Sequence, residues 1–198
     1  MKTAGSTWTP GRPVELDTEN FTLRSLQARN ISQRYVDWWN DPSIMEGIAR
    51  PSQKTTVQEQ RRRLANLYDN QRNFQWGIFD KSDGSMVGFI DIFCQPFHRI
   101  AKMNTVIGER NLWGHNLLLE VNEAGMAFIF ETLGMEKISG RTQARNFATV
   151  YINKAMGLSV EAVLRGEWRH EDGRRVDVLA FGLLREDWRA RRRAKTGR

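Results

Sequence analysis

The sequence predicts one α/β domain built on a single mixed sheet, antiparallel at its start and parallel at its centre, with helices on both faces. Strand-like stretches follow one another from residue 74 to 108, broken by the hairpin signal Lys81–Gly84. A segment that is apolar nearly all round, 115–133, fits a helix buried against a sheet. The strand pattern at 137–142 then completes a βαβ unit with the strand before that helix.

Length and composition agree with one globular domain. The chain has 198 residues, of which 40% are hydrophobic and 27% are charged, an ordinary balance for a soluble protein. No apolar run approaches the roughly 20 residues that cross a bilayer, and the N-terminus lacks the apolar core of a signal peptide. The single cysteine, Cys94, excludes an internal disulfide and a cysteine-based metal site. We therefore expect a cytoplasmic protein with no bound metal.

The first third of the chain reads as an arm, a strand and a helix. Residues 1–17 are expected to form a loose N-terminal arm. Apolar and polar side chains alternate over 20–26, which predicts the first strand. Helical spacing follows over 31–40, with Ser32 near its start, and ends before Pro42, because proline disfavours helix at the residue before it. A loop is expected over 43–54.

A second helix and three antiparallel strands follow. The helix is expected from Thr56 to about residue 71, because Glu59 suits a capping box with Thr56. The strands are expected at 74–80, 85–93 and 99–108, as a meander.

Helices and strands alternate in the last third. Gly134 is expected to end the buried helix. Asn146 is placed to start another helix over 147–156, and two closing strands are predicted at 159–168 and 175–184.

The net charge of +7 is concentrated at the C-terminus. Residues 189–198 carry six basic groups and no acidic group, which leaves the rest of the chain nearly neutral. We expect a domain over 18–188 and a disordered, solvated tail that attracts polyanions such as nucleic acid only weakly. No basic face interleaved with aromatic residues runs through the domain, which disfavours a nucleic-acid-binding module.

The junction before the buried helix has the features of an anion site. The first N–H groups of a helix have no partner within it, and the helix dipole adds partial positive charge there. Gly114 removes the Cβ that would hold a phosphate away from these groups. A phosphate-bearing cofactor is therefore expected between Gly108 and Leu117. The simpler alternative is an ordinary helix start, because strand–glycine–helix junctions are common in α/β proteins.

Four local matches, taken with the order of elements, point to a family. They are Leu23-Arg24, Trp39-Asn40-Asp41-Pro42, Trp113-Gly114 followed by Glu120, and Asn146 with Thr149 and Gly157. Over residues 18–188 the chain resembles the GNAT superfamily of acyl-CoA-dependent N-acyltransferases. Within it, the chain looks closest to the branch with ribosomal-protein alanine N-acetyltransferases and amino-sugar N-acetyltransferases.

The resemblance implies acetyl-CoA as co-substrate. By this analogy, the strand backbone at Val106 to Gly108 binds the pantetheine arm, the N–H groups of the following turn bind the pyrophosphate, and Asn146 holds the cofactor near the parallel strands. The implied cofactor-binding residues are Val106, Ile107, Gly108, Leu112, Trp113, Gly114, His115, Asn116, Leu117 and Asn146.

Three positions depart from the family pattern. Asn116 replaces the second turn glycine, Asn153 occupies the position of the tyrosine acid of many relatives, and Ala155 replaces a lysine. A non-catalytic acyl-CoA-binding module of the same fold therefore stays an alternative.

The chemistry requires a base for the amine and an acid for the leaving thiolate. Asp91, in the middle of an apolar strand, and Glu109, just past the next strand, are the candidate bases. A solvent-facing alternation explains Asp91 equally well, and an exposed turn explains Glu109. Asn153 is the third candidate, because it stands at the acid position.

Five residues are candidates for an acceptor pocket: Trp38, Trp39, Asn40, His98 and Asn104. Of the two tryptophans, one is expected in the core and one in the cleft. The expected reaction is direct transfer of an acetyl group, in a ternary complex, to a primary amine of a small molecule such as an amino sugar. A protein N-terminal acetyltransferase is the alternative, and the chain is expected to be a monomer or a homodimer.

Overall fold

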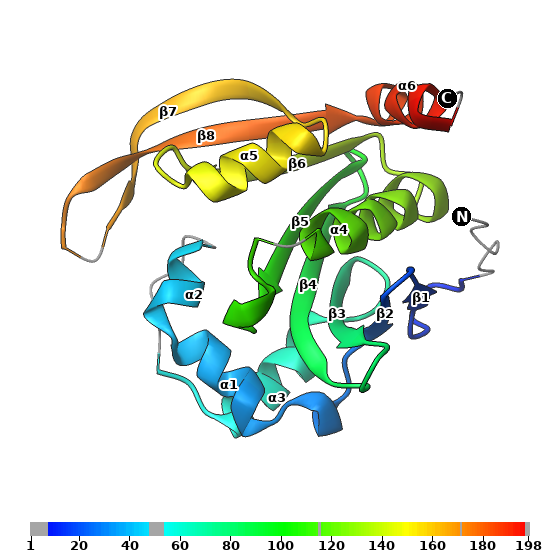
Figure 1. Cartoon of the computed structure of the whole chain (residues 1–198), viewed down its shortest axis with the longest axis vertical. Coiled ribbons are helices and arrows are strands. Elements are labelled where there is room, and N and C mark those ends of the chain that lie inside the picture. The colour runs from blue at the N-terminus through cyan, green and yellow to red at the C-terminus, as the bar shows by residue number, and fades with distance from the viewer. Residues whose placement is uncertain (1–7, 48–53, 115, 171, 197–198) are drawn as a thin grey trace.

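Eight strands form one sheet in the order β1-β2-β3-β4-β5-β6-β8-β7 (Figure 1). The computed structural model describes residues 8–47, 54–114, 116–170 and 172–196. Neighbouring strands are antiparallel except for β5 and β6, so the predicted mixed sheet is confirmed. The strands are β1 (Glu15–Asp17), β2 (Phe21–Ser25), β3 (Asn73–Asp80), β4 (Met86–Gln95), β5 (Ile100–Ile107), β6 (Lys137–Gln143), β7 (Ser159–Arg169) and β8 (Arg175–Leu184).

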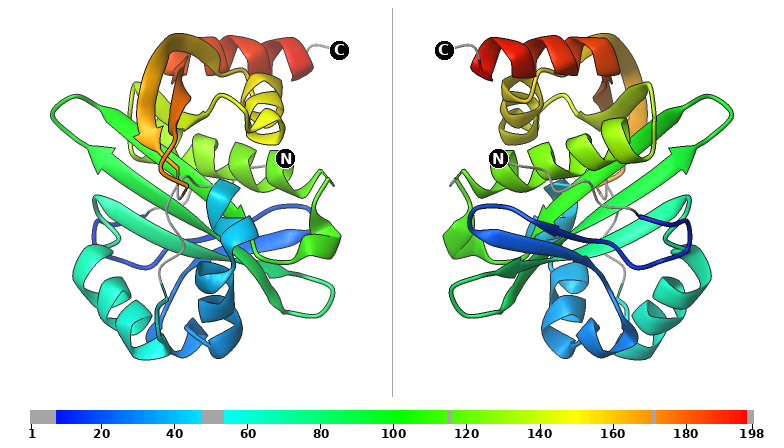
Figure 2. Two further views of the ribbon diagram at one scale, coloured as in Figure 1. Left: turned by 90° about the vertical axis from the view of Figure 1, so that its left-hand side faces the viewer. Right: turned by 90° about the vertical axis from the view of Figure 1, so that its right-hand side faces the viewer.

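Helices cover both faces of this sheet (Figure 2). One hydrophobic core joins one face to α4, α5 and α6, and a second core joins the other face to α1, α2 and α3. The helical segments are η1 (Ala28–Asn30), α1 (Gln33–Asn40), α2 (Pro42–Gly47), α3 (Val57–Leu67), η2 (Arg110–Leu112), α4 (Leu117–Ala127), η3 (Phe128–Thr132), α5 (Phe147–Ala155) and α6 (Arg185–Thr196).

The alternation along β4 separates the two cores. Ile90 and Ile92 are fully buried under α4, whereas Phe89 belongs to the core under α1 and α3. Successive side chains of a strand point to opposite faces. Asp91 therefore shares the face of Phe89, beneath α1 and α3.

The expected helix starts are confirmed where capping groups exist. Ser32 accepts a hydrogen bond from the Tyr35 N–H and begins α1. Thr56 and Glu59 form the predicted capping box of α3. This helix ends at Leu67, about one turn before the predicted end.

The loop expected over 43–54 is wrong in its first part. Residues 42–47 form α2, since proline is favoured at the first position of a helix. The Asp41 carboxylate also accepts the backbone N–H of Ser43, which caps this turn. Residues 48–53 lie outside the described part of the chain.

The predicted buried helix has two segments. Its α-helical part begins at Leu117, and its last turn, Phe128–Thr132, is π-helical. Gly134 follows with φ +65°, which confirms its role in ending the helix.

The N-terminal arm is not loose from Trp8 onward. The Trp8 ring lies 5.7 Å from the rings of Phe74 and Phe128, and Val14 is buried. Residues 15–17 pair with β2 as strand β1. Aromatic contacts with residues far away in the sequence hold this segment. The glycine- and proline-rich composition of the segment gives no sign of these contacts, which is why the sequence predicts a loose arm.

The C-terminal segment is also folded, contrary to the disordered tail expected over 189–198. Residues 185–196 form α6, and Trp188 is fully buried against α4 with its indole N–H donating to Glu123. Arg191 pairs with Glu123 at 2.7 Å, and Arg192 pairs with Glu131 at 3.0 Å. The basic run therefore has partners in the carboxylates of α4 and η3; residues 197 and 198 are not described.

Candidate active site

The parallel strands at the centre of the sheet separate soon after they begin. β5 and β6 pair only between 100–102 and 137–139, although β5 continues to Ile107 and β6 to Gln143. On its other side β6 stays paired with β8 along its whole length. Within the described ranges, the later residues of β5 therefore have no strand neighbour on the β6 side, which leaves peptide groups for an extended ligand.

The peptide groups facing this opening differ from those expected. The Gly108 N–H donates to the Val87 carbonyl at 2.9 Å, so it is directed at β4. Because the direction alternates along an antiparallel ladder, Val106 also faces β4. Met103, Thr105 and Ile107 therefore face the opening, and of the three expected residues at 106–108 only Ile107 keeps this place.

The turn between β5 and α4 supplies an open corner. Gly114 has φ +81°, and apart from its own residue and its two chain neighbours no described atom lies within 4 Å of where its Cβ would stand. The N–H groups of Leu112 and Trp113 bond to carbonyls inside the turn, so these two expected phosphate donors are wrong. The N–H groups of Gly114, Asn116 and Leu117 bond to no backbone carbonyl among the residues described. His115, also expected here, lies outside the described residues.

Asn116 and Trp113 define the geometry of this corner. Asn116 precedes α4 with φ −70°, so its position does not require the left-handed backbone that a second glycine would supply. The Trp113 indole donates to the Ile107 carbonyl at 3.0 Å and fixes the turn against the end of β5. Together with the dipole of α4, this corner can hold a phosphate group.

Glu120 on α4 is structural. Its carboxylate accepts hydrogen bonds from the Thr18 hydroxyl and from the backbone and side chain of Asn20. Burial opposes ionisation, but these hydrogen bonds outweigh it and lower the pKa of Glu120.

α5 begins at the end of β6 that has separated from β5. Asn146 caps it by accepting the Thr149 N–H at 3.0 Å. Asn153 lies on this helix with its side chain half-buried, and Tyr151 is 71% exposed. The Asn153 amide can donate a hydrogen bond but cannot supply a proton as a tyrosine does.

Asp91 is buried at 4% exposure, so the solvent-facing alternation is excluded. Its Oδ1 accepts the Tyr68 hydroxyl at 3.0 Å and the Gln75 amide at 2.9 Å. Asn104, directly opposite Asp91 across β4 and β5, is exposed on the same face of the sheet. The Asp91 carboxylate thus lies one strand away from the opening, with β5 between them, and is held by donors from β3 and from the residue that follows α3.

Glu109 is held in an ion pair, and His98 lies away from the opening. Glu109 forms an ion pair with Arg34 at 2.8 Å, which ties the end of β5 to α1 and opposes a role as base. His98 precedes β5 in the exposed turn from β4. That turn is at the end of β5 that pairs with β6, so the expectation that His98 flanks the cleft is wrong.

The acceptor residues expected on α1 are engaged elsewhere. Trp38 and Trp39 are 4% and 6% exposed, so both are in the core and neither lines a cleft. The Asn40 side chain bonds to both the N–H and the carbonyl of Thr55, which joins the end of α1 to the start of α3. From the sequence, the aromatic residues and the asparagine of α1 could equally contact a ligand or the rest of the protein, and the structure shows that they contact the protein.

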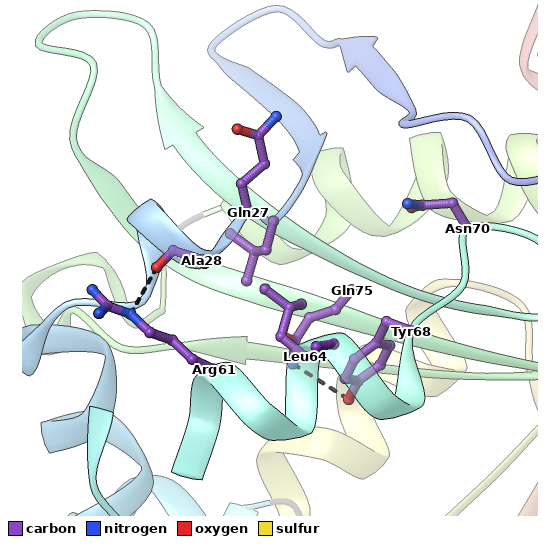
Figure 3. Close-up of a pocket in the computed structure, with 9 residues that line it drawn as sticks. Gln27, Ala28, Arg61, Leu64, Tyr68, Asn70 and Gln75 are labelled. Carbon is purple, nitrogen blue, oxygen red and sulfur yellow. Dashed lines mark hydrogen bonds between the residues drawn. The ribbon is translucent and has the colours of Figure 1, made fainter. Parts of the chain in front are cut away.

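A separate recess of about 260 Å³ lies between α3 and the end of β2 (Figure 3). Arg61 borders it and donates to the carbonyls of Ala28 and Ile31. Tyr68 and Gln75 are part of its wall, so it lies behind the donors that hold Asp91. Its lining residues are Leu26, Gln27, Ala28, Arg61, Leu64, Ala65, Tyr68, Asn70 and Gln75.

Two absences hold for the part of the chain that the structure describes. It contains no group of three histidine, cysteine or carboxylate side chains placed to bind a metal ion. None of its helices combines the length and apolar character needed to cross a membrane.

Comparison with known proteins identifies a shared domain. The acetyltransferase (GNAT) domain family model matches residues 20–159. The N-acetyltransferase p20 of Bacillus licheniformis, described as uncharacterized, is 23% identical over 87% of this chain and 97% of its own. The similarly described YoaA of Bacillus subtilis is 22% identical over 86% and 96%.

Solved structures share the architecture at low identity. Spermidine N-acetyltransferase from Vibrio cholerae, in complex with CoA and spermine, has a TM-score of 0.78 and 18% identity, covering 85% of this chain and 98% of its own. A GCN5-related N-acetyltransferase from Brucella melitensis has a TM-score of 0.76 and 16% identity, covering 96% and 89%. These likenesses establish the fold.

Proposed function

Because the chain belongs to the GNAT acetyltransferase family, we propose that it is an N-acetyltransferase whose acceptor is a primary amine of a small molecule. The family and the named relatives establish the acyl-CoA-dependent class. The acceptor and the residues that act on it are our proposal.

One observation carries the assignment of the co-substrate site. β5 and β6 separate beside the open Gly114 corner at the start of α4. An extended arm can bond to the backbone of Met103 and Thr105 and to the Ile107 N–H as an added strand does; the Ile107 carbonyl already accepts the Trp113 indole. A diphosphate at the end of that arm would meet the N–H groups and the positive dipole of α4. The two features fit the two chemically distinct parts of CoA.

The chain's own groups can support acyl transfer without a covalent intermediate on the protein. N–H groups of β5 that face the opening are suited to stabilise the oxyanion that develops on a thioester carbonyl. Asp91 is the proposed base, acting directly or through one water. Cys94 is a poor nucleophile, because burial raises the pKa of its thiol to about 11.

Charge near the acceptor side supports a small amine. The carboxylates of Asp41 and Glu109 are each paired with an arginine, at 2.6 and 2.8 Å. Asp91 is the buried carboxylate of β4, one strand away from the opening. A single carboxylate can pair with a single ammonium group of a small amine. Because the Vibrio cholerae neighbour was solved with spermine, polyamines are included among the amines to be tested.

The test is a transfer assay with acetyl-CoA and a panel of polyamines, amino sugars, amino acids and short peptides. Thiol release and mass spectrometry of the products report the reaction. We expect acetylation of a small amine with stoichiometric release of CoA. Acetylation of peptide N-termini alone would contradict the proposed acceptor, and CoA binding without transfer to any class would favour a binding module.

A further inference from the structure

A polar network links the proposed base to α3 and the residue that follows it. We propose that Tyr68, supported by Arg63, is the positioning residue that holds Asp91 in the orientation in which it takes a proton from the incoming amine. This inference rests on the proposed function. It assigns a role to two residues whose place in the sequence does not mark them as part of a site.

Two donors converge on a single oxygen of Asp91. The Tyr68 hydroxyl lies 3.0 Å and the Gln75 amide 2.9 Å from Oδ1. Two donors on one oxygen fix the rotation of the carboxylate about its last bond. Because Asp91 is 4% exposed, bulk water does not compete for these contacts. The orientation of the carboxylate therefore depends on where Tyr68 and Gln75 stand.

Arg63 fixes the direction of the Tyr68 hydroxyl. Its Nη2 donates to the Tyr68 oxygen at 3.3 Å, and its guanidinium lies 5.1 Å from the centre of the Trp39 ring. A phenol has only one hydrogen to donate. With Arg63 and Gln75 donating to the oxygen, the hydroxyl hydrogen is directed at Asp91.

The surroundings of Asp91 keep the Tyr68 hydroxyl protonated, so that it continues to donate its hydrogen bond. Burial, followed by the charge of Asp91, raises the pKa of Tyr68, so its hydroxyl stays protonated at ordinary pH. Arg63 approaches the carboxylate from α3, and Tyr35 approaches from α1; burial raises the pKa of Tyr35 as well. Gln75 and Asn104, the cross-strand neighbours, carry no charge. Tyr35 stays uncharged and its hydroxyl makes no hydrogen bond to the carboxylate, whereas Arg63 carries a positive charge.

The recess of Figure 3 lies beside Tyr68, so the position of the ring depends on its hydrogen bonds more than on packing. Tyr68 and Gln75 line this hollow of about 260 Å³. A ring that borders a hollow is held less tightly by packing than one in a filled core. Loss of the Tyr68 hydroxyl should therefore let the remaining phenyl ring and the carboxylate shift.

The test compares two buried tyrosines. Tyr68→Phe removes the donor to Asp91. Tyr35→Phe is the matched control, because Tyr35 is also buried but its hydroxyl makes no hydrogen bond to Asp91. The dependence of kcat and kcat/KM on pH is measured with acetyl-CoA and the best amine of the panel.

We expect Tyr68→Phe to lower kcat about tenfold or more and to leave KM for acetyl-CoA unchanged. Its acidic limb in kcat/KM should move to higher pH, because a donor to the charged form of Asp91 is lost. Arg63→Met should move that limb in the same direction, and Arg63→Lys should largely restore it. Tyr35→Phe should leave both the limb and kcat unchanged.

Three results would overturn the inference. One is a Tyr68→Phe enzyme with lowered thermal stability but wild-type kcat and pH profile, which would show a structural role only. Another is an equal kinetic change in the two phenylalanine variants. If Tyr68→Phe does not fold, a wild-type pH profile in Arg63→Met would decide against it. A wild-type protein that acetylates no amine would instead overturn the proposed function, and this inference with it.

Discussion

Gly108 lies directly against the ring of Trp38. A Cβ added at Gly108 would overlap the ring atoms of that tryptophan. The first residue after β5 and the middle of α1 therefore approach more closely than any side chain at position 108 permits. This contact places the exit of β5 relative to α1, immediately before the turn to Gly114.

Gly108→Ala should consequently destabilise the protein. We expect a loss of about 1–3 kcal/mol in the free energy of unfolding, because the added methyl overpacks a filled site. Gly140→Ala on β6 is the control, since no described atom beyond its two chain neighbours lies within 4 Å of where its Cβ would stand. It should change stability by about 0.5 kcal/mol or less. Urea unfolding measures both changes, provided that the dependence of the free energy on urea concentration is the same for all proteins. Equal unfolding midpoints for the two variants would contradict the close contact between Gly108 and Trp38.

Glu120 should contribute stability that depends on pH. Its pKa is lowered in the folded state, so the contribution is present above the unfolded pKa of about 4.3 and is lost as pH falls through the folded value. We expect Glu120→Gln to cost about 1 kcal/mol at pH 7, below the roughly 1.5–3 kcal/mol of a hydrogen bond to a charged group because the carboxylate is partly exposed. This difference should shrink below about pH 4.

Denaturant titrations of wild type and Glu120→Gln at pH 7 and at low pH measure this dependence. Glu15→Gln, which changes an exposed carboxylate on β1, is the control and should show no such trend. A cost of Glu120→Gln that stays constant with pH would argue against the ionised contacts with Thr18 and Asn20.

The C-terminal helix should be part of the cooperative fold. Trp188→Ala removes a fully buried side chain and should cost about 3–5 kcal/mol. Arg189→Ala changes the adjacent, exposed residue and should stay within about 0.5 kcal/mol of wild type. Thermal unfolding compares them. A Trp188→Ala protein as stable as wild type would support the solvated tail that the sequence predicts over 189–198.

Local rules predict most elements of this fold. Period-two alternation locates the strands of the meander, and side-chain caps at Ser32 and Thr56 locate two helix starts. The two ends of the chain depart from prediction for a shared reason. Trp8 and Trp188 are held by partners far away in sequence, Phe128 and Glu123. The composition around each tryptophan carries no information about such a distant partner.

The corner of the site can be predicted from sequence, but its detail cannot. Gly114 is identifiable because an open, left-handed position at a helix start is a local property. Which peptide groups of β5 face the opening depends on the parity of its pairing with β4, and a shift of one residue reverses it. Asp91 is recognisable from its apolar neighbours, whereas its donor Tyr68 comes from another part of the chain and gives no local signal.

The assignment of the co-substrate site requires that the corner at Gly114 binds the diphosphate of CoA. Calorimetric titration with CoA tests this binding, using Gly114→Glu and the matched control Gly84→Glu. Both glycines have positive φ and open space at the Cβ position, so backbone strain is similar, but Gly84 lies in the β3–β4 turn. We predict wild-type affinity for Gly84→Glu and no measurable binding by folded Gly114→Glu. Wild-type affinity in Gly114→Glu would contradict the assignment.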